Sequence, residues 1–222
     1  MSVGGRVRRS LVESPGSLGD RFRGRRWALA LERFPELADM SVVDLGGTVQ
    51  AWERAPVRPA HVTVLNLTEP GESTSDSIVP VTGDACDAAA VLAAAGGRTQ
   101  FDLVFSNSVL EHLGGHSNRS RFAEGARLLA PLHWIQTPYR YFPIEPHWLF
   151  PGMQFLPLAV RARIAATWPL SHSHSPDLDR ATSAALWTEL ISVTELRHYF
   201  PQSDIVRERA LGLTKSIIAI RS

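Results

Sequence analysis

An α/β fold with a mainly parallel sheet is predicted for this chain by three observations. Apolar strand-like segments alternate with helical segments through residue 137, these strands are apolar along their length, and glycines or polar residues follow where they end. Strands that are buried on both faces are apolar throughout, as in parallel sheets that carry helices on both sides. Ligands of such sheets bind beyond the carboxyl ends of the strands, so we expect the site there.

The first predicted strand gives the strongest local signal. Residues 41–47 are Ser-Val-Val-Asp-Leu-Gly-Gly, an apolar run that ends in an acid and two glycines. Glycine lets the backbone approach a bulky group without a Cβ atom in the way. This stretch therefore predicts a buried strand that stops at a tight turn beneath a ligand.

The remaining elements follow in order. Further strands are predicted at residues 62–67, 78–81, 101–106, 132–137, 204–209 and 216–220. Helices are predicted at residues 20–39 (broken near Pro35), 88–95, 121–129 and 192–200, the last opened by Ser192 or Thr194. Residues 138–191 lack the alternation and are rich in Pro, Trp and His, which favours a cap or lid. We expect one domain over residues 1–222, with a basic arm and helix at residues 1–39.

Composition limits the classes of function. The chain has 222 residues, 44% of them hydrophobic, and a formal net charge of +1, so a globular fold is expected and the overall charge indicates neither nucleic acid nor an anionic membrane as partner. Many arginines lie in the first 26 residues. This segment is expected to be a solvated tail or, alternatively, an arm that folds over an anionic ligand. No apolar run is long enough to span a membrane. The single cysteine, Cys86, excludes an internal disulfide, and a cytoplasmic protein is expected.

Residues 42–47 and 101–112 carry a resemblance to a known family. Val-Val-Asp-Leu-Gly-Gly resembles the first motif of class I S-adenosylmethionine-dependent methyltransferases, and Phe-Asp-Leu-Val-Phe-Ser-Asn-Ser-Val-Leu-Glu-His is similar to their fourth motif. The resemblance extends over roughly residues 40–137 and 192–220. It implies a Rossmann-like, seven-stranded, mostly parallel sheet with an antiparallel last strand, helices on both faces and a cap after the fifth strand.

The resemblance also implies the cofactor, S-adenosylmethionine, with S-adenosylhomocysteine as the product. Asn66 stands where the family usually has an acid for the ribose hydroxyls, and Asp84 stands where an acid meets the adenine amino group. The usual pattern of three spaced glycines is reduced to Gly46 and Gly47. The implied cofactor-binding residues are Asp44, Gly46, Gly47, Asn66, Asp84, Ala85, Ser106 and Asn107.

Transfer of a methyl group to a hydroxyl needs orientation and removal of a proton. We expect His147 or His112 as the base, with Glu111 orienting it or holding a metal. Similarity to quinone-type O-methyltransferases, which carry Glu-x-x-Glu-His at this place, implies a divalent ion such as Mg²⁺ on Glu111 and His112, although Ser108 replaces the first acid. The alternative is that Glu111 orients local backbone and that His112 packs on the sheet.

Residues 137–148, Thr-Pro-Tyr-Arg-Tyr-Phe-Pro-Ile-Glu-Pro-His-Trp, leave the fifth predicted strand on the ligand side. Their prolines stiffen the backbone, and aromatic faces beside polar groups suit a polyhydroxylated acceptor. The segment resembles those of bacterial polysaccharide-linked O-methyltransferases, including mycobacterial sugar O-methyltransferases of methylmannose polysaccharide synthesis. The expected substrate-binding residues are Tyr139, Arg140, Tyr141, Glu145 and Trp148. The alternative is a structural cover for the sheet.

The prediction is an O-methyltransferase of a small-molecule or oligosaccharide acceptor. The alternatives are N- or C-methylation of another small metabolite and a non-catalytic binding domain on the same scaffold. The aromatic stretch 148–168 could form a homodimer or an intramolecular lid. His172, His174 and Asp177 are expected in a solvated loop rather than at a metal, and Cys86 is expected to be a packing residue.

Overall fold

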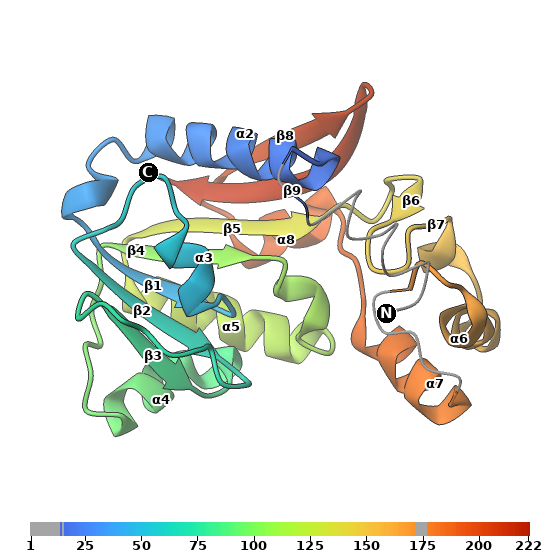
Figure 1. The fold of residues 1–222 in the computed structure, drawn as a ribbon, viewed down its shortest axis with the longest axis horizontal. Coiled ribbons are helices and arrows are strands. Elements are labelled where there is room, and N and C mark those ends of the chain that lie inside the picture. Colours follow the sequence, from blue (N-terminus) through green and yellow to red (C-terminus); the bar gives the residue numbers. More distant parts are fainter. Residues whose placement is uncertain (1–13, 15, 172–176) are drawn as a thin grey trace.

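The computed structural model describes residue 14, residues 16–171 and residues 177–222. Its centre is a seven-stranded sheet in the order β3-β2-β1-β4-β5-β9-β8 (Figure 1). The pairs from β3 to β5 are parallel, and β9 is antiparallel to both of its neighbours. The predicted α/β architecture with an antiparallel last strand is therefore confirmed. The strands are β1 Ser41–Leu45, β2 His61–Asn66, β3 Ile78–Thr82, β4 Leu103–Asn107, β5 Leu132–Pro138, β8 Asp204–Ala210 and β9 Leu213–Arg221.

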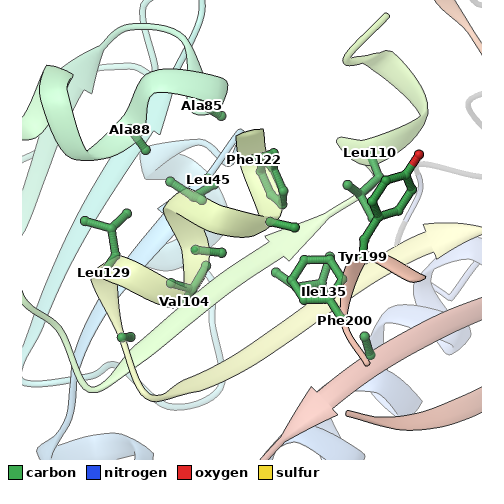
Figure 2. Close-up of a cluster of buried hydrophobic side chains, with 14 of the residues drawn as sticks. Leu45, Ala85, Ala88, Val104, Leu110, Phe122, Leu129, Ile135, Tyr199 and Phe200 are labelled. Carbon is green, nitrogen blue, oxygen red and sulfur yellow. The ribbon is translucent and has the colours of Figure 1, made fainter. Parts of the chain in front are cut away.

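Each face of the sheet has its own hydrophobic core, because successive side chains of a strand point to opposite faces. Val43 of β1 belongs to the core beneath α4 (Ala88–Ala94), α5 (His116–Leu129) and α8 (Val193–Tyr199), part of which Figure 2 shows. Val42 belongs to the opposite core, beneath α2 (Leu18–Arg33) and α3 (Val49–Glu53). Burial on both faces explains why the strands are apolar throughout.

Aromatic rings form much of the second core. Phe105 of β4 lies between Trp27 of α2 and Trp134 of β5, with ring centroids 5.6 and 5.8 Å away and nearly parallel planes. Trp52 of α3 meets Phe105 edge-on at 5.3 Å. Such contacts add to the burial of large apolar surfaces and fix α3 directly behind the end of β1.

Local sequence sets the helix boundaries. Ser192, one of the two residues expected to open this helix, is the N-cap of α8 and forms a capping box with Glu195. The helix predicted at residues 121–129 begins earlier, at His116, because Gly114 and Gly115 have positive φ angles and make the turn just before it. Short 3-10 helices lie at η2 Leu37–Asp39, η3 Ala85–Asp87, η4 Leu110–His112 and η5 Met153–Phe155.

The segment between β5 and α8 forms regular elements that the sequence did not predict. It contains the hairpin β6 (Ile144–Glu145) and β7 (Phe150–Pro151), and the helices α6 (Leu158–Thr167) and α7 (Leu178–Trp187). Figure 1 shows these elements beyond the carboxyl ends of β4 and β5, where a ligand is expected. Their own small core includes Trp148 and Met153. In the part of the chain that the structure describes, no helix is long and apolar enough to cross a membrane.

Candidate active site

The turn after β1 needs glycine at both positions. Gly46 has a φ of +87°, and a Cβ atom there would lie 2.3 Å from Cγ2 of Val109. A Cβ atom on Gly47 would lie 1.7 Å from Oδ2 of Asp44. The backbone of Gly46 also donates to the carbonyl of Leu65 in β2, at 2.7 Å. The two glycines thus let the turn pack closely against β2, the segment after β4 and its own strand.

Asp44 is a buried carboxylate beneath this turn. Its Oδ2 accepts a hydrogen bond from Nε1 of Trp52 at 2.7 Å. Burial raises the pKa of Asp44 to about 7, and the bond from Trp52 opposes this only in part. The carboxylate is therefore costly to ionise in this position.

Asn66 uses its amide to hold the glycine turn. Its Nδ2 donates to the carbonyls of Gly46 and Gly47, at 3.2 and 2.7 Å, while Oδ1 accepts from the backbone of Thr68 at 3.3 Å. A carboxylate cannot donate, so an acid could not make the first two bonds. The two hydrogen bonds that Nδ2 of Asn66 donates give a physical reason for asparagine at a position where an acid was expected.

The ends of the neighbouring strands are bonded to this turn. The backbone of Gly83, after β3, donates to the carbonyl of Asn66 at 2.8 Å. Ser106 of β4 is buried, and its hydroxyl donates to the carbonyl of Leu45 at 2.8 Å, so it ties strands together rather than facing a ligand. The strand ends named from the sequence therefore form one connected edge.

The other two polar residues at this edge are more exposed. Asp84 accepts a bond from the backbone of Cys86 at 2.8 Å and so caps η3, in which Ala85 is buried. Asn107 accepts from Nε1 of Trp134 at 3.2 Å. Cys86 is a buried free thiol with its pKa raised to about 12 by burial, which agrees with a packing role.

An open cleft of about 790 Å³ lies between this edge and the cap. Asn66 and Thr68 line it from the sheet side, His112 from η4, and His147 from the β6–β7 hairpin. The volume is in the range of small-molecule sites. The structure thus brings Asn66 together with His112, His147 and Trp148 on the lining, although these residues are far apart in the sequence.

His147 is held by Glu145. Nδ1 of His147 lies 2.6 Å from Oε1 of Glu145, and Oε2 of Glu145 accepts from the backbones of His147 and Trp148 at 2.7 and 3.0 Å. Glu145 is buried, and both of its oxygens have partners inside the protein. Glu145 therefore positions His147 instead of facing an acceptor, and the orienting role considered for Glu111 is carried out by Glu145.

His112 and Glu111 complete a cluster with His147. The Nε2 atoms of His112 and His147 are 3.0 Å apart, and their rings are nearly perpendicular. Glu111 is fully buried; its Oε2 accepts from the hydroxyl of Thr137 at 2.9 Å. Burial raises the pKa of Glu111 to about 7, against the favourable charge of His147. His112 thus contacts His147 and lines the cleft.

The residues expected on the acceptor side are only partly at the cleft. Arg140 pairs with Glu195 at 3.0 Å and donates to the carbonyl of Leu190, so its guanidinium connects β5 to α8. Tyr139 and Tyr141 meet edge to face, and Tyr141, 57% exposed, stacks on Phe155. Neither tyrosine nor Arg140 lines the cleft, whereas Trp148 does.

Helix α7 contributes cleft residues that sequence reasoning missed. Ser183 and Trp187 of α7, and Thr188 directly after it, line the cleft together with the two histidines. The spacing of Ser183 and Trp187 places them on one helix face, but nothing in the local sequence indicates which surface this face would meet. Asp177, expected in a solvated loop, is the N-cap residue of α7. His172, His174 and the arginines Arg6, Arg8 and Arg9 lie outside the described residues.

No protein-family model matches the chain, and no curated protein matches it in sequence. Solved structures do match. An S-adenosylmethionine-dependent methyltransferase from Mesorhizobium loti is 16% identical, with a TM-score of 0.53 over 90% of this chain and 98% of that chain. Magnesium protoporphyrin IX methyltransferase from Synechocystis PCC 6803, solved with bound S-adenosylhomocysteine, is 11% identical, with a TM-score of 0.55 over 98% and 94%.

The N-methyltransferase NodS from Bradyrhizobium japonicum WM9 is 11% identical, with a TM-score of 0.50 over 90% of this chain and 96% of that chain. At these identities the likeness establishes the fold. The chain has the Rossmann-like fold of S-adenosylmethionine-dependent methyltransferases, with a cap over the carboxyl ends of its central strands.

Proposed function

We propose that the protein is an S-adenosylmethionine-dependent O-methyltransferase that acts on a hydroxyl group of a saccharide or a similar polyhydroxylated acceptor. The observation that carries the proposal is the position of the Glu145–His147 pair. It lies on a cleft whose other wall includes Asn66, which holds the glycine turn. The fold alone does not imply an activity, whereas this pair places a candidate base on the cleft.

The residues at the strand ends fit the cofactor. The turn at Gly46 and Gly47 brings backbone without side chains to the edge of the sheet, and the cleft has room for a nucleoside and an acceptor. When bound, S-adenosylmethionine supplies the methyl group. Asn66 and Asp84 are the residues we assign to its ribose and adenine, and Asp44 supports the turn from below.

His147 is the group best placed to accept the hydroxyl proton. Its Nδ1 is fixed by Oε1 of Glu145, which leaves Nε2 as the acceptor atom. The bonds to Glu145 also hold the ring in one orientation, as a general base requires. His112, 3.0 Å from His147, is the adjacent polar group.

The cleft wall from α7 supports a hydroxylated acceptor. Trp187 is 54% exposed at the cleft, and Ser183 and Thr188 bring hydroxyl groups to the same lining. An aromatic face beside hydroxyls can stack on a sugar ring and bond its hydroxyls. We therefore assign acceptor binding to Trp187, which takes the place expected for Tyr139 and Tyr141.

Titration calorimetry with S-adenosylhomocysteine, followed by a labelled methyl-transfer assay on candidate saccharides, tests the proposal. We expect S-adenosylhomocysteine to bind and His147→Gln to lower kcat about 10²- to 10⁴-fold at little change in cofactor affinity. His116→Gln, an exposed histidine away from the cleft, is the control. Absence of S-adenosylhomocysteine binding would favour the non-catalytic alternative.

N-methylation of a small metabolite is the second candidate, because NodS is among the structures that share the fold. An amine that reacts in its neutral form needs little base catalysis. Replacing His112 and His147 together would then leave turnover nearly unchanged, which separates this candidate from the O-methyltransferase.

A homodimer through residues 148–168 is also part of the proposal. Phe155 is 56% exposed, although Trp148 is buried within the cap and the Phe150 and Trp168 rings meet at 5.3 Å. Analytical ultracentrifugation of the protein and of Phe155→Ser tests it. A monomeric wild-type protein would favour the intramolecular lid.

A further inference from the structure

We propose that Glu111, His112 and His147 bind a divalent transition-metal ion at the edge of the cleft. Two of these residues belong to η4, and the third belongs to the β6–β7 hairpin. One candidate ligand atom from each residue lies within 4.8 Å of the others. Two histidines and one carboxylate form a donor set that metal centres commonly use.

The two imidazoles have the spacing that a shared ion requires. Their Nε2 atoms are 3.0 Å apart. An ion about 2.1 Å from each nitrogen, the usual bond length for Zn²⁺, would see them at an angle of about 90°. That angle is the one between neighbouring ligands in octahedral coordination, so the observed separation needs little adjustment.

Glu145 prepares His147 for this role. Its Oε1 holds Nδ1 of His147 at 2.6 Å, so the ring proton is placed on Nδ1 and the lone pair on Nε2. A carboxylate behind a ligating histidine fixes the ring and raises its basicity, and such partners are found at most metal-bound histidines. Glu145 is therefore a positioning residue for the metal site.

Glu111 supplies the third donor. Its Oε2 is engaged by Thr137, whereas Oε1 is buried and has no hydrogen-bond partner among the described residues. A buried carboxylate oxygen without a partner is unfavourable, and a cation would satisfy it. Thr137 of β5 holds the carboxylate from the other side and limits its rotation.

The donor set indicates which metals fit. Mg²⁺ prefers oxygen ligands in a near-ideal octahedron, whereas imidazole nitrogens suit Zn²⁺, Fe²⁺, Co²⁺ or Ni²⁺. With two nitrogens in the set, we expect a first-row transition metal in place of the Mg²⁺ that the sequence suggested. His112 and His147 also line the cleft, so the ion would be reachable by an acceptor.

The consequence for the reaction depends on the proposed function. A bound ion lowers the pKa of a coordinated hydroxyl and holds its oxygen in place. Nε2 of His147 would then be a ligand and no longer a base; the ion would lower the pKa of the acceptor hydroxyl, and the proton would pass to solvent water in the open cleft. The roles of base and ligand are alternatives for this one atom, and metal binding decides between them.

The experiment uses the full chain, freed of metal with a chelator and titrated separately with Zn²⁺, Co²⁺ and Mg²⁺ by calorimetry, with Co²⁺ binding also followed by visible absorption. We expect one ion per chain, with Zn²⁺ and Co²⁺ bound far more tightly than Mg²⁺. Glu111→Gln and His147→Gln should each weaken Zn²⁺ binding on the order of 100-fold, and Glu145→Gln about 10- to 100-fold. His198→Gln removes an exposed histidine beside His116 and should leave affinity unchanged.

Two results would overturn the metal site. One is Zn²⁺ affinity that is the same in the wild type, Glu111→Gln and His147→Gln, and the other is a preference for Mg²⁺. Because Glu111 is buried, His147→Gln, at a partly exposed position, decides the matter if Glu111→Gln fails to fold. Titration of the metal-free protein with S-adenosylhomocysteine separates the proposals: binding without any metal affinity keeps the methyltransferase and removes the metal site.

Discussion

Replacing Asp44 with asparagine should change how the stability of the protein depends on pH. The carboxylate is buried beneath the glycine turn, with Trp52 as its hydrogen-bond donor and a pKa raised to about 7. Asparagine keeps the shape and a carbonyl that can accept from Trp52, but it carries no charge at any pH. The variant therefore isolates the cost of ionising this one group.

The magnitude follows from the two pKa values. The unfolded chain has the ordinary value of 3.8, and the folded protein has about 7. A shift of about 3 units corresponds to about 4 kcal/mol. Because the folded state binds the proton on Asp44 more tightly than the unfolded chain does, the contribution of this group to stability is fully present below pH 4 and is lost as the pH rises through 7. In Asp44→Asn this loss is absent, so the variant gains about 4 kcal/mol relative to the wild type between pH 4 and pH 8.

Urea unfolding followed by tryptophan fluorescence, repeated from pH 4 to pH 8, measures the difference. The comparison of variant with wild type cancels the titration of groups that both proteins share. Glu124→Gln, which removes an exposed carboxylate from α5, is the control and should leave the pH profile unchanged. Parallel profiles for wild type and Asp44→Asn would refute the reasoning. If Asp44 supports the cofactor, the same variant should bind S-adenosylhomocysteine more weakly although it is more stable above pH 7.

Three other substitutions test the structure. His133 is buried with its pKa lowered to about 4, so its titration should cost the wild type about 3 kcal/mol relative to His133→Gln as the pH falls from 6.5 to 4; parallel pH profiles of the two proteins would contradict this. In Asn66→Asp the side chain cannot donate to the glycine turn, and because each of the two lost hydrogen bonds is worth about 1 kcal/mol, the free energy of unfolding at pH 7 should fall by about 2 kcal/mol. Unchanged stability would count against the role of Asn66 in holding the turn. In Gly46→Ala the new residue must adopt a positive φ and displace Val109, which should lower the free energy of unfolding in urea by an amount on the order of 2 kcal/mol. Gly97→Ala is the control, because its added Cβ would lie 4.0 Å from the nearest atom.

Much of the sheet could be predicted because its signals are local. Buried parallel strands are apolar on both faces, so residues 42–45 and 101–106 stand out without any knowledge of their partners. The capping box at Ser192 and the glycines after β1 are equally local. The first residues of α5, 116–120, were not predicted as helix. The start of this helix depends on two consecutive glycines with positive φ angles, which the sequence alone does not assign.

The candidate site was predictable only in part. Its members were identified by chemical type, but their partners were not. Glu145 was expected at the acceptor, and it holds His147; Arg140 was expected there too, and it pairs with Glu195. A polar side chain beside a strand end can face a ligand or bond to neighbouring backbone, and the sequence does not distinguish these outcomes.

What the sequence determined by itself is the seven strands of the central sheet, their order along the chain and the glycine turn at the edge of the sheet. What only the tertiary structure decided is the meeting of Glu111, His112 and His147. Their approach depends on the cap, which is anchored by buried Arg119 through bonds to the carbonyl of Leu110 and to Glu189. The physical reason is range: backbone propensity and apolar periodicity act over a few residues, whereas contacts between segments 35 residues apart depend on how the whole cap packs against the sheet.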